Sequence, residues 1–287
     1  LLTAPEIGLV TEAAVSAAFR KFRITGGEPT LRKDLTEIVS RMRAVAPEAD
    51  IAMTTNGILL PGLAEDLKSA GLDRVNIHLD TLDGERVRQI MRLADLDKIL
   101  AGIDAASAAG LAPVKLNSVV VRALNDNDLV EMARLTIDQP IHVRFIELMP
   151  FGSGEPEEIA RQQVVPSAES RQKIEAALGE LIPDPSPDPA DESRNFRFAN
   201  AQGNIGFISP VSDPFCGFCN RVRLSAEGKL LLCLLRDDEA DLRSVIRSGG
   251  GVTAIREALS KAILQKPVGH ALDQGIHSSR RMHEIGG

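Results

Sequence analysis

Cysteine is scarce in this 287-residue sequence, and the three cysteines present, Cys216, Cys219 and Cys233, lie close together. Small secreted domains built on disulfides carry more cysteines, spread along the chain, so this pattern excludes that class and fits a reducing compartment such as the cytoplasm. Long apolar runs are also absent, and Glu6 and Glu12 interrupt the N-terminal stretch where a signal peptide would be apolar. We therefore expect a soluble cytoplasmic protein with no membrane partner.

An excess of positive charge is missing as well, because the formal net charge is -7. Proteins that bind nucleic acids generally depend on a basic surface, so we expect no nucleic-acid partner. Any anionic ligand of this chain must be held by a local cluster of Lys and Arg side chains.

The cysteines that are present have the pattern of a metal site. Cys216-Gly217-Phe218-Cys219 places two sulfurs one turn apart, and Cys233 follows at a short distance in the sequence. Thiolates are the ligands that zinc and iron–sulfur clusters select. Three thiolates are one fewer than the usual four protein ligands. The remaining position is open to a histidine, a solvent molecule or a substrate.

Residues 220–233 have the pattern of a β-hairpin. Two short strand-like runs flank a glycine-containing turn near Glu227, and this turn would bring Cys233 back beside Arg221. Side chains alternate along a strand, so Arg221 and Arg223 would face the same anion next to the metal. Phosphate is the natural candidate for that anion. A zinc-stapled hairpin with two solvated arginines is the alternative.

The first half of the chain has the pattern of a β/α repeat, which implies a parallel sheet. Helix-like periodicity separates five strand-like runs, at residues 21–25, 50–54, 74–79, 114–121 and 142–147. Polar residues gather where these runs end, as β/α barrels arrange them, which favours a barrel over a doubly wound sheet. Five strands do not close an eight-stranded barrel, so we expect an α/β fold with a partial barrel.

The pattern changes after Pro150, and we expect one domain over residues 1–150 and a second over 151–287. The proline-rich segment 183–194 is predicted to be an exposed linker, because its prolines allow neither a helix nor a central strand. Strand-like residues 196–198 and 204–208 follow, and then the cysteine hairpin.

Several motifs together resemble the molybdenum cofactor biosynthesis protein A family, the GTP 3′,8-cyclases of the radical S-adenosylmethionine class. These motifs are Thr25-Gly26-Gly27-Glu28-Pro29-Thr30-Leu31-Arg32, Thr54-Thr55-Asn56-Gly57, Asn76-Ile77-His78-Leu79-Asp80-Thr81-Leu82, Arg144-Phe145-Ile146-Glu147-Leu148-Met149-Pro150, and the segment from Phe215 to Cys233. The resemblance extends almost from end to end. It implies a partial (β/α)6 TIM-like barrel of the radical SAM type with a C-terminal extension.

The resemblance also implies an enzyme with two [4Fe–4S] clusters and S-adenosylmethionine. In the family, the N-terminal cluster cleaves S-adenosylmethionine, and the resulting radical converts GTP to (8S)-3′,8-cyclo-7,8-dihydroguanosine 5′-triphosphate, the first step of molybdenum cofactor (molybdopterin) biosynthesis. The second cluster leaves one iron free for guanine, which agrees with the open ligand position above. An electron donor and a downstream cyclic pyranopterin monophosphate synthase are implied partners, and a homodimer is left open.

Residue roles follow by position. Gly27, His78 and Met149 match contacts to S-adenosylmethionine, although relatives are expected to carry Ser at the position of His78. Each also has a simpler interpretation, as a turn glycine, a packed barrel residue and a core methionine. The positions matched to GTP binding are Arg23, Thr54, Lys115, Arg221 and Arg223.

The remaining assignments concern the cluster and the tail. Cys216, Cys219 and Cys233 match the ligands of the C-terminal cluster, and the terminal Gly286 and Gly287 match a family tail that reaches the active site. Arg32 and Arg144 are left unassigned, because either could be an ion-pair partner without a functional role.

One family motif is missing. Radical S-adenosylmethionine enzymes carry a Cys-x-x-x-Cys-x-x-Cys loop after their first strand, and this sequence has no cysteine before Cys216. We expect that the first strand and this loop precede residue 1, and that the 287-residue chain alone has no cyclase activity. Another radical SAM maturase and a non-catalytic metal-binding relative are the alternative functions.

Overall fold

The computed structural model of the protein describes residues 1–91, 95–150, 155–186, 188, 190–270, 272 and 278, without the side chains of residues 155–157. The expected tail residues Gly286 and Gly287 lie outside these ranges. Among the described helices, none combines the length and the apolar character needed to cross a membrane.

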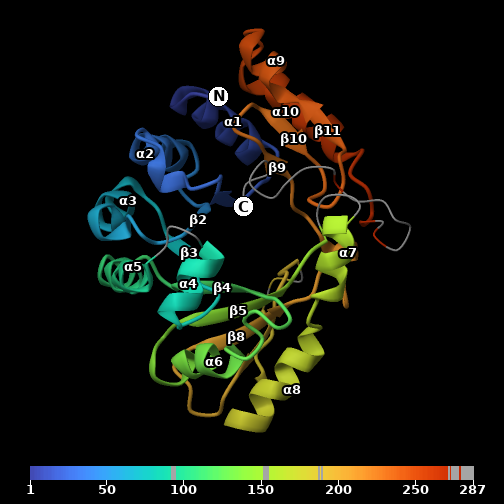
Figure 1. The fold of residues 1–287 in the computed structure, drawn as a ribbon. Helices are drawn as coiled ribbons and strands as arrows, with labels where there is room; N and C mark the ends of the chain where they lie inside the picture. The colour runs from blue at the N-terminus through green and yellow to red at the C-terminus, as the bar shows by residue number, and fades with distance from the viewer. Residues whose placement is uncertain are drawn as a thin grey trace.

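The central element is a curved eight-stranded sheet with the strand order β1-β2-β3-β4-β5-β8-β7-β6 (Figure 1). Its strands are β1 (Lys21–Ile24), β2 (Asp50–Thr55), β3 (Arg74–His78), β4 (Lys115–Val120), β5 (His142–Glu147), β6 (Ile182–Pro183), β7 (Arg194–Arg197) and β8 (Asn204–Ile208). Neighbouring strands from β1 through β5 to β8 pair in parallel, and β7 and β6 extend the sheet antiparallel. The expected α/β fold with a mostly parallel central sheet is confirmed.

Helices connect the strands and cover the outer side of the sheet (Figure 1). The helices of the chain are α1 (Ala4–Ser16), α2 (Leu35–Val45), α3 (Ala64–Ala70), α4 (Gly84–Met91), α5 (Leu96–Ala108), α6 (Leu129–Asp138), α7 (Glu155–Gln162), α8 (Ser167–Leu178), α9 (Leu242–Arg247) and α10 (Gly251–Ile263). Of these, α9 packs on α10, and α10 packs on α1. A smaller antiparallel sheet consists of β9 (Arg223–Leu224), β10 (Lys229–Leu231) and β11 (Glu239–Asp241).

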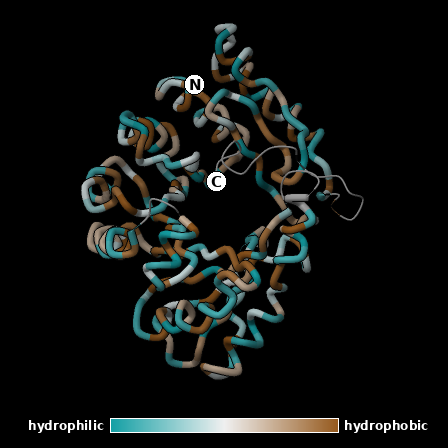
Figure 2. The backbone as a smooth tube through the Cα atoms, viewed as in Figure 1, coloured by the Kyte–Doolittle hydropathy of each residue, from teal (hydrophilic) through white to brown (hydrophobic). Residues whose placement is uncertain are grey.

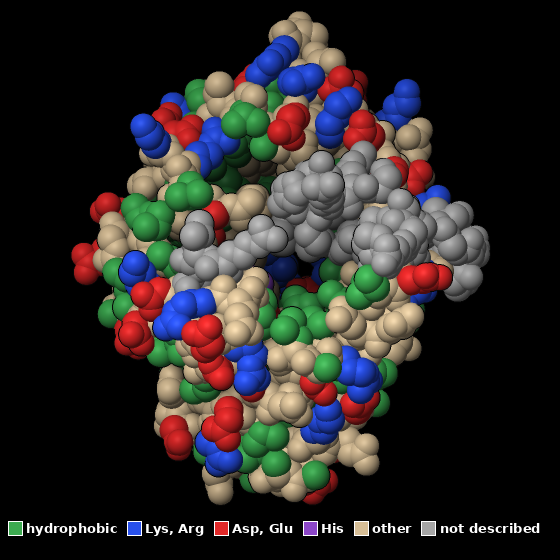
Figure 3. Space-filling view, viewed as in Figure 1, with side chains coloured by type: hydrophobic (Ala, Val, Ile, Leu, Met, Phe, Trp, Pro, Cys, Tyr) green, Lys and Arg blue, Asp and Glu red, His purple; other side chains and the backbone are tan. Residues whose placement is uncertain are grey.

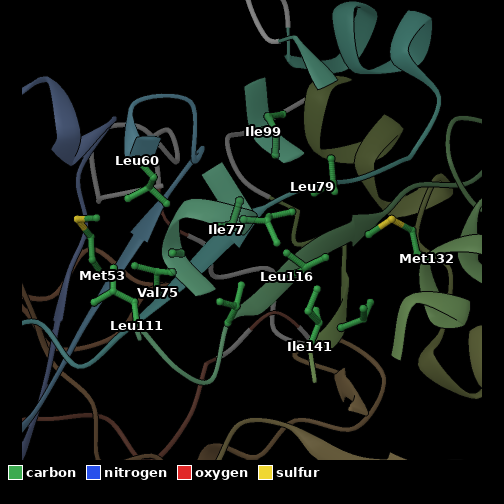
Figure 4. Packing of buried hydrophobic residues seen from close by; sticks show 14 of the residues in the cluster. Met53, Leu60, Val75, Ile77, Leu79, Ile99, Leu111, Leu116, Met132 and Ile141 are labelled. Atoms are coloured by element: carbon green, nitrogen blue, oxygen red, sulfur yellow. The ribbon is translucent and has the colours of Figure 1, made fainter. Parts of the chain in front are cut away.

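Alternation along the strands gives the large sheet two chemically different faces. The outward-facing side chains pack under the helices and are at most 1 % exposed, and they include Ile51, Met53, Val75, Ile77, Leu116, Val143 and Phe145 (Figure 4). The alternate positions on the same strands carry polar side chains, which are Arg23, Thr54, Arg74, Asn76, His78, Lys115, Asn117, His142, Arg144 and Asn204. The helix-covered face is therefore the core, and the inner face is available for a polar ligand.

A second apolar cluster joins the beginning of the chain to its C-terminal part. Side chains of α1, the hairpin and α10 form it, among them Val10, Leu230 and Leu259. Figure 2 shows apolar residues along these segments. Apolar burial of this kind stabilises a fold by about 25 cal/mol per Å². The cluster holds the hairpin against α1 and so beside β1.

Polar contacts fix the start of α1 in the same place. Thr3 and Glu6 form a capping box, in which the Thr3 backbone N–H donates to Glu6 Oε2 at 2.8 Å. The Glu6 carboxylate also accepts from Arg247 of α9 at 2.8 Å, and the Leu2 N–H donates to the Ala226 carbonyl in the hairpin turn at 2.7 Å. The arginine hydrogen bond is the largest cause that lowers the pKa of Glu6 to about 2.

Most of the predicted strands are observed within a residue or two of their expected bounds. The expectation of an exposed linker over residues 183–194 is wrong for its second half. Ser193 is 7 % exposed, and the Glu192 side chain is 13 % exposed because it points into the inner face of the sheet. Strand β8, from the C-terminal half, pairs with β5, so the sheet crosses the expected boundary at residue 150.

Candidate active site

The most distinctive feature of the inner face is a cluster of arginines around one carboxylate, that of Glu192. Arg221 donates to its Oε2 at 2.8 Å, while Arg144 and Arg23 approach its Oε1 at 3.3 and 3.4 Å. Burial would raise the pKa of Glu192, but the charges of Arg23, Arg221 and Arg144 outweigh burial and hold that pKa at about 2. Glu192 is therefore ionised, and it forms the centre of an anion-binding arrangement.

Arg144 lies deepest in this cluster. It projects from the middle of β5, its side chain is only 4 % exposed, and its Nε donates to Asn117 Oδ1 of β4 at 3.0 Å. Its Nη2 is buried and has no hydrogen-bond partner among the described residues. Burial, together with the nearby charges of Arg23 and Arg74, lowers the pKa of Arg144 to about 10. A buried guanidinium with an unused donor favours an additional anionic ligand.

Lys115 supplies a further buried cation. Across the sheet it lies in one row with Thr54, Asn76 and His142, which the strand register pairs in that order. Burial and the charges of Arg144 and Arg74 lower the pKa of Lys115 to about 8. Within the row, Asn76 donates its Nδ2 to Thr54 Oγ1 at 3.3 Å.

A cavity of about 250 Å³ opens beside this row. Its lining includes Lys115, His142, Arg144, Asp191 and Asn204. Burial and the charge of Lys115 lower the pKa of His142 to about 4, so this imidazole is neutral at physiological pH. Figure 3 shows a hollow near the centre of the molecule in which Lys or Arg side chains are visible.

The hairpin brings two more arginines to the same place. Leu224 pairs with Leu230, and Arg223 pairs with Leu231. Continuing this register puts Cys233 opposite Arg221, as the sequence predicted. The Arg221 guanidinium also lies over the Phe215 ring, with Cζ 4.6 Å from the ring centroid.

Arg223 lies near Arg23 and Arg221. Burial, together with the charges of these two arginines, lowers the pKa of Arg223 to about 10. The prediction that Arg221 and Arg223 face one anion is thus supported for Arg221 by a direct ion pair and for Arg223 by proximity.

The three cysteines surround the open side of the hairpin. Cys216 and Cys219 flank a short turn closed by the Cys219 N–H donating to the Cys216 carbonyl at 3.1 Å. Burial raises the pKa of the Cys233 thiol, and the charges of Cys216 and Cys219 raise it further. A Cβ added at Gly269 would come within 3.2 Å of Cys216 Cβ, so a glycine keeps this side open.

Within the described part of the chain, no three His, Cys, Asp or Glu side chains are placed to hold a single metal ion. In a cubane cluster each thiolate binds its own iron, so the sulfurs need not converge on one point. Cys216, Cys219 and Cys233 are partly exposed free thiols, the donor type that such a cluster requires.

The candidate cofactor contacts lie at the C-terminal ends of the parallel strands. Gly27 follows β1, His78 ends β3 and Met149 follows β5. Gly27 is exposed, with no atom within 4 Å of an added Cβ, and Met149 is half-buried. The assignment of these three residues to S-adenosylmethionine stays a prediction.

His78 at these strand ends is paired with Asp80 through its Nε2 at 2.8 Å. Burial lowers the pKa of His78, but the hydrogen bond and charge of Asp80 outweigh burial and raise it. The imidazole can still donate a hydrogen bond where a serine hydroxyl was expected.

Glu28 organises the same strand ends. One carboxylate oxygen accepts from the Thr30 hydroxyl at 2.6 Å and from the Thr55 hydroxyl at 2.7 Å, and the other accepts from the Asn56 N–H at 2.7 Å. Glu28 therefore ties the loop after β1 to the loop after β2, which fixes the backbone around Gly27.

Arg144 and Glu192 were not predicted as site residues from the sequence. The signal for Arg144 was present, because an arginine at an inward position of a central parallel strand must be buried and so needs an anion. No comparable signal existed for Glu192, which lies in a segment with the composition of a linker. Arg32 pairs with Asp34 at 2.7 Å and donates to the Leu2 carbonyl at 2.8 Å, so it is a structural residue.

Comparison with known proteins identifies the family. Residues 1–136 match the family model described as Radical SAM superfamily, and residues 141–272 match the one described as Molybdenum Cofactor Synthesis C. A GTP 3′,8-cyclase of Pelotomaculum thermopropionicum is 44% identical over 287 residues, which are 100% of this chain and 88% of the relative. The chain belongs to the GTP 3′,8-cyclase family. The resemblance inferred from the motifs is confirmed.

Other members of the family show the same extent of similarity. A GTP 3′,8-cyclase of Heliobacterium modesticaldum is 45% identical over 276 residues, which are 96% of this chain and 84% of the relative. Among solved structures, a radical SAM methyltransferase from Sphaerobacter thermophilus covers 52% of this chain and 50% of its own, at 18% identity and a TM-score of 0.41.

Proposed function

We propose that this protein is a GTP 3′,8-cyclase that converts GTP to (8S)-3′,8-cyclo-7,8-dihydroguanosine 5′-triphosphate in molybdenum cofactor biosynthesis. One observation carries the proposal, beyond family membership. A chain with a net charge of -7 gathers five cationic side chains where the inner face of its sheet meets the three-cysteine hairpin. These five are Arg23, Lys115, Arg144, Arg221 and Arg223.

The cationic side chains have the chemistry to bind the triphosphate. Guanidinium groups offer paired donors to phosphate oxygens, and Lys115 supplies a point charge at the floor of the cavity. Thr54, in the same row, can donate its hydroxyl to a phosphate or a ribose oxygen. Because the strands hold Arg23 and Arg144 in fixed positions, the nucleotide is oriented as well as bound.

Cys216, Cys219 and Cys233 would hold a [4Fe–4S] cluster next to the arginines. Three thiolate ligands leave one iron available to a ring nitrogen or exocyclic group of guanine. The triphosphate on the arginines and the base near the hairpin then fix the nucleotide at both of its ends, with the ribose between them. The Phe215 ring under Arg221 keeps that guanidinium in place.

The C-terminal ends of the parallel strands would bind S-adenosylmethionine through Gly27, His78 and Met149. When bound together with a second [4Fe–4S] cluster, this cofactor supplies the radical that attacks the ribose. The polar inner face connects these strand ends to the GTP site. The two ligands would therefore meet inside the curved sheet, away from the helices.

Partners follow from this chemistry. The reaction needs GTP, S-adenosylmethionine and an electron donor, and a cyclic pyranopterin monophosphate synthase would consume the product. A role for Gly286 and Gly287 near the site and a homodimeric assembly stay predictions.

The proposal is tested with the product of the native gene, reconstituted anaerobically with iron and sulfide. We expect about eight irons per chain, as two cubane clusters require, and formation of 5′-deoxyadenosine and the cyclic nucleotide from GTP under reducing conditions. About four irons with no 5′-deoxyadenosine would contradict the enzymatic function, and zinc in place of iron would contradict the radical chemistry altogether.

The 287-residue chain provides a control in the same experiment. Its cysteines are all in the hairpin, so we expect about four irons, GTP binding and no 5′-deoxyadenosine.

A further inference from the structure

Glu192 occupies the place where a phosphate group of the substrate would be expected. Its carboxylate lies among Arg23, Arg144 and Arg221, which come from β1, β5 and the hairpin. These three elements are far apart in the sequence, and they converge on this one anion. Among the described residues of segment 183–194, no other has so buried an ion pair, since Asp188 pairs with the exposed Lys21.

The carboxylate does not satisfy the arginines that surround it. The contact with Arg221, at 2.8 Å, has the length of a strong charge-assisted hydrogen bond, whereas those with Arg144 and Arg23, at 3.3 and 3.4 Å, are long for such bonds. Arg144 Nη2 is buried without a partner among the described residues. A phosphate group has more acceptor oxygens than a carboxylate and would use these donors more fully.

Packing and an ion pair hold the backbone next to Glu192 in place. Ser193 packs against Gly206 of β8, where an added Cβ would come within 2.1 Å of Ser193 Oγ. The segment is also held at Asp188 by an ion pair with Lys21. Glu192 therefore needs only to rotate its flexible side chain in order to leave the arginines, while the backbone stays in place.

We propose that Glu192 is an internal competitor for the phosphate-binding part of the GTP site, displaced by the phosphates of the incoming nucleotide. This inference rests on the proposed function, since it assigns the regulation of the same site. Without nucleotide, Glu192 neutralises part of the charge around the buried Arg144. With nucleotide, the ligand must compete with a tethered carboxylate, so a weakly charged ligand binds poorly.

Only ligands with phosphate groups should compete with Glu192. A ligand whose phosphates reach the three arginines must displace the carboxylate, and it gains affinity when the carboxylate is removed. A ligand without phosphates does not compete with Glu192. The difference between inorganic tripolyphosphate and guanosine therefore isolates the effect.

The experiment measures binding of inorganic tripolyphosphate, GTP and guanosine to the 287-residue chain by calorimetry, after anaerobic cluster reconstitution. We expect Glu192→Gln to bind tripolyphosphate and GTP at least tenfold more tightly than the unmodified chain, with guanosine binding unchanged. Glu169→Gln is the matched control, because Glu169 also bridges two cations, Arg122 and Lys173, outside the site. It should leave all three affinities unchanged.

Glu192→Asp keeps a negative charge beside Arg144 and so preserves folding if the glutamine variant is unstable. Its shorter side chain should give a smaller gain in tripolyphosphate affinity. Unchanged or weaker tripolyphosphate binding in both variants would overturn the inference, because Glu192 would then be a fixed structural partner of the arginines. A gain for tripolyphosphate in a chain that does not bind GTP would support the inference while contradicting the proposed function.

Discussion

Two regions of the same inner face carry opposite chemistry. The region bearing Gly27, His78 and Met149 is organised by carboxylates, with Glu28 tying two loops together and Asp80 paired with His78. The other region gathers cations around Glu192 and beside the cysteine hairpin. Under the proposed function, one curved sheet would bind S-adenosylmethionine and a polyanionic nucleotide in two separate places, and the predictions below test that separation.

The largest effect is expected from removing a cysteine. Cys233→Ala should abolish assembly of the hairpin cluster, because two remaining thiolates are too few to hold it. Iron and sulfide analysis of the 287-residue chain should fall from about four irons per chain to almost none. Phe218→Ala in the same turn is the control, since this exposed side chain is no ligand. Retention of iron by the Cys233 variant would show that the hairpin is not the cluster site.

Removing an arginine at the cationic region should reduce GTP binding strongly. Arg221→Ala deletes a charge-assisted contact of the kind worth about 1.5–3 kcal/mol, so the dissociation constant for GTP should rise about 10- to 100-fold. Fluorescent-nucleotide titration measures this change.

Arg171→Ala is an unusually close control for Arg221→Ala. Arg171 also pairs with a glutamate, Glu175, and lies over the Phe196 ring at 4.3 Å, but it belongs to α8 on the outer side. We expect GTP affinity to be unchanged in this variant. Equal losses in the two variants would mean that Arg221 acts through stability and not through the ligand.

GTP binding should depend on pH through Lys115. Its pKa in the free protein is about 8, and a bound triphosphate would raise that pKa, so binding takes up a proton above pH 8. Affinity is then fully present below pH 8 and falls by up to about tenfold per pH unit above it. In Lys115→Arg the guanidinium stays charged, and the profile between pH 7 and 9.5 should flatten. A wild-type profile that is already flat would contradict a direct role for Lys115.

The smallest effect on GTP affinity is expected from a change at the C-terminal ends of the strands. Glu28→Gln replaces a carboxylate that accepts from Thr30, Thr55 and Asn56, and it should cost about 1–3 kcal/mol of unfolding free energy, measured by urea denaturation. GTP affinity should stay within twofold of the unmodified chain. A large loss of GTP binding would show that the two regions are coupled and not separate.

Local patterns in the sequence predicted much of this molecule. Alternation and turn residues located the parallel strands and the hairpin, because these signals act between near neighbours in the chain. The pairing of Arg223 with Leu231 followed from one turn. The proposed role of Arg23 and Lys115 came from the family resemblance. The structure then placed Arg23 with Arg221 on Glu192, and Lys115 near Arg144.

Long-range ionic contacts could not be predicted in this way. The position of Glu192 depends on how β1, β5, β8 and the hairpin come together, and its local sequence, rich in proline and aspartate, has the composition of a linker. Arg144 was left unassigned for the same reason, since its partner was unknown. The sequence showed where cations lie, and only the fold showed which anion they share.

The most direct test of the account is equilibrium binding of GTP to the reconstituted 287-residue chain, with S-adenosylmethionine absent and then present. The account predicts binding of GTP without S-adenosylmethionine, competition by inorganic tripolyphosphate, and loss of affinity in Arg221→Ala but not in Arg171→Ala. GTP binding that requires S-adenosylmethionine, or that is indifferent to Arg221, would contradict a separate nucleotide site at the cationic region.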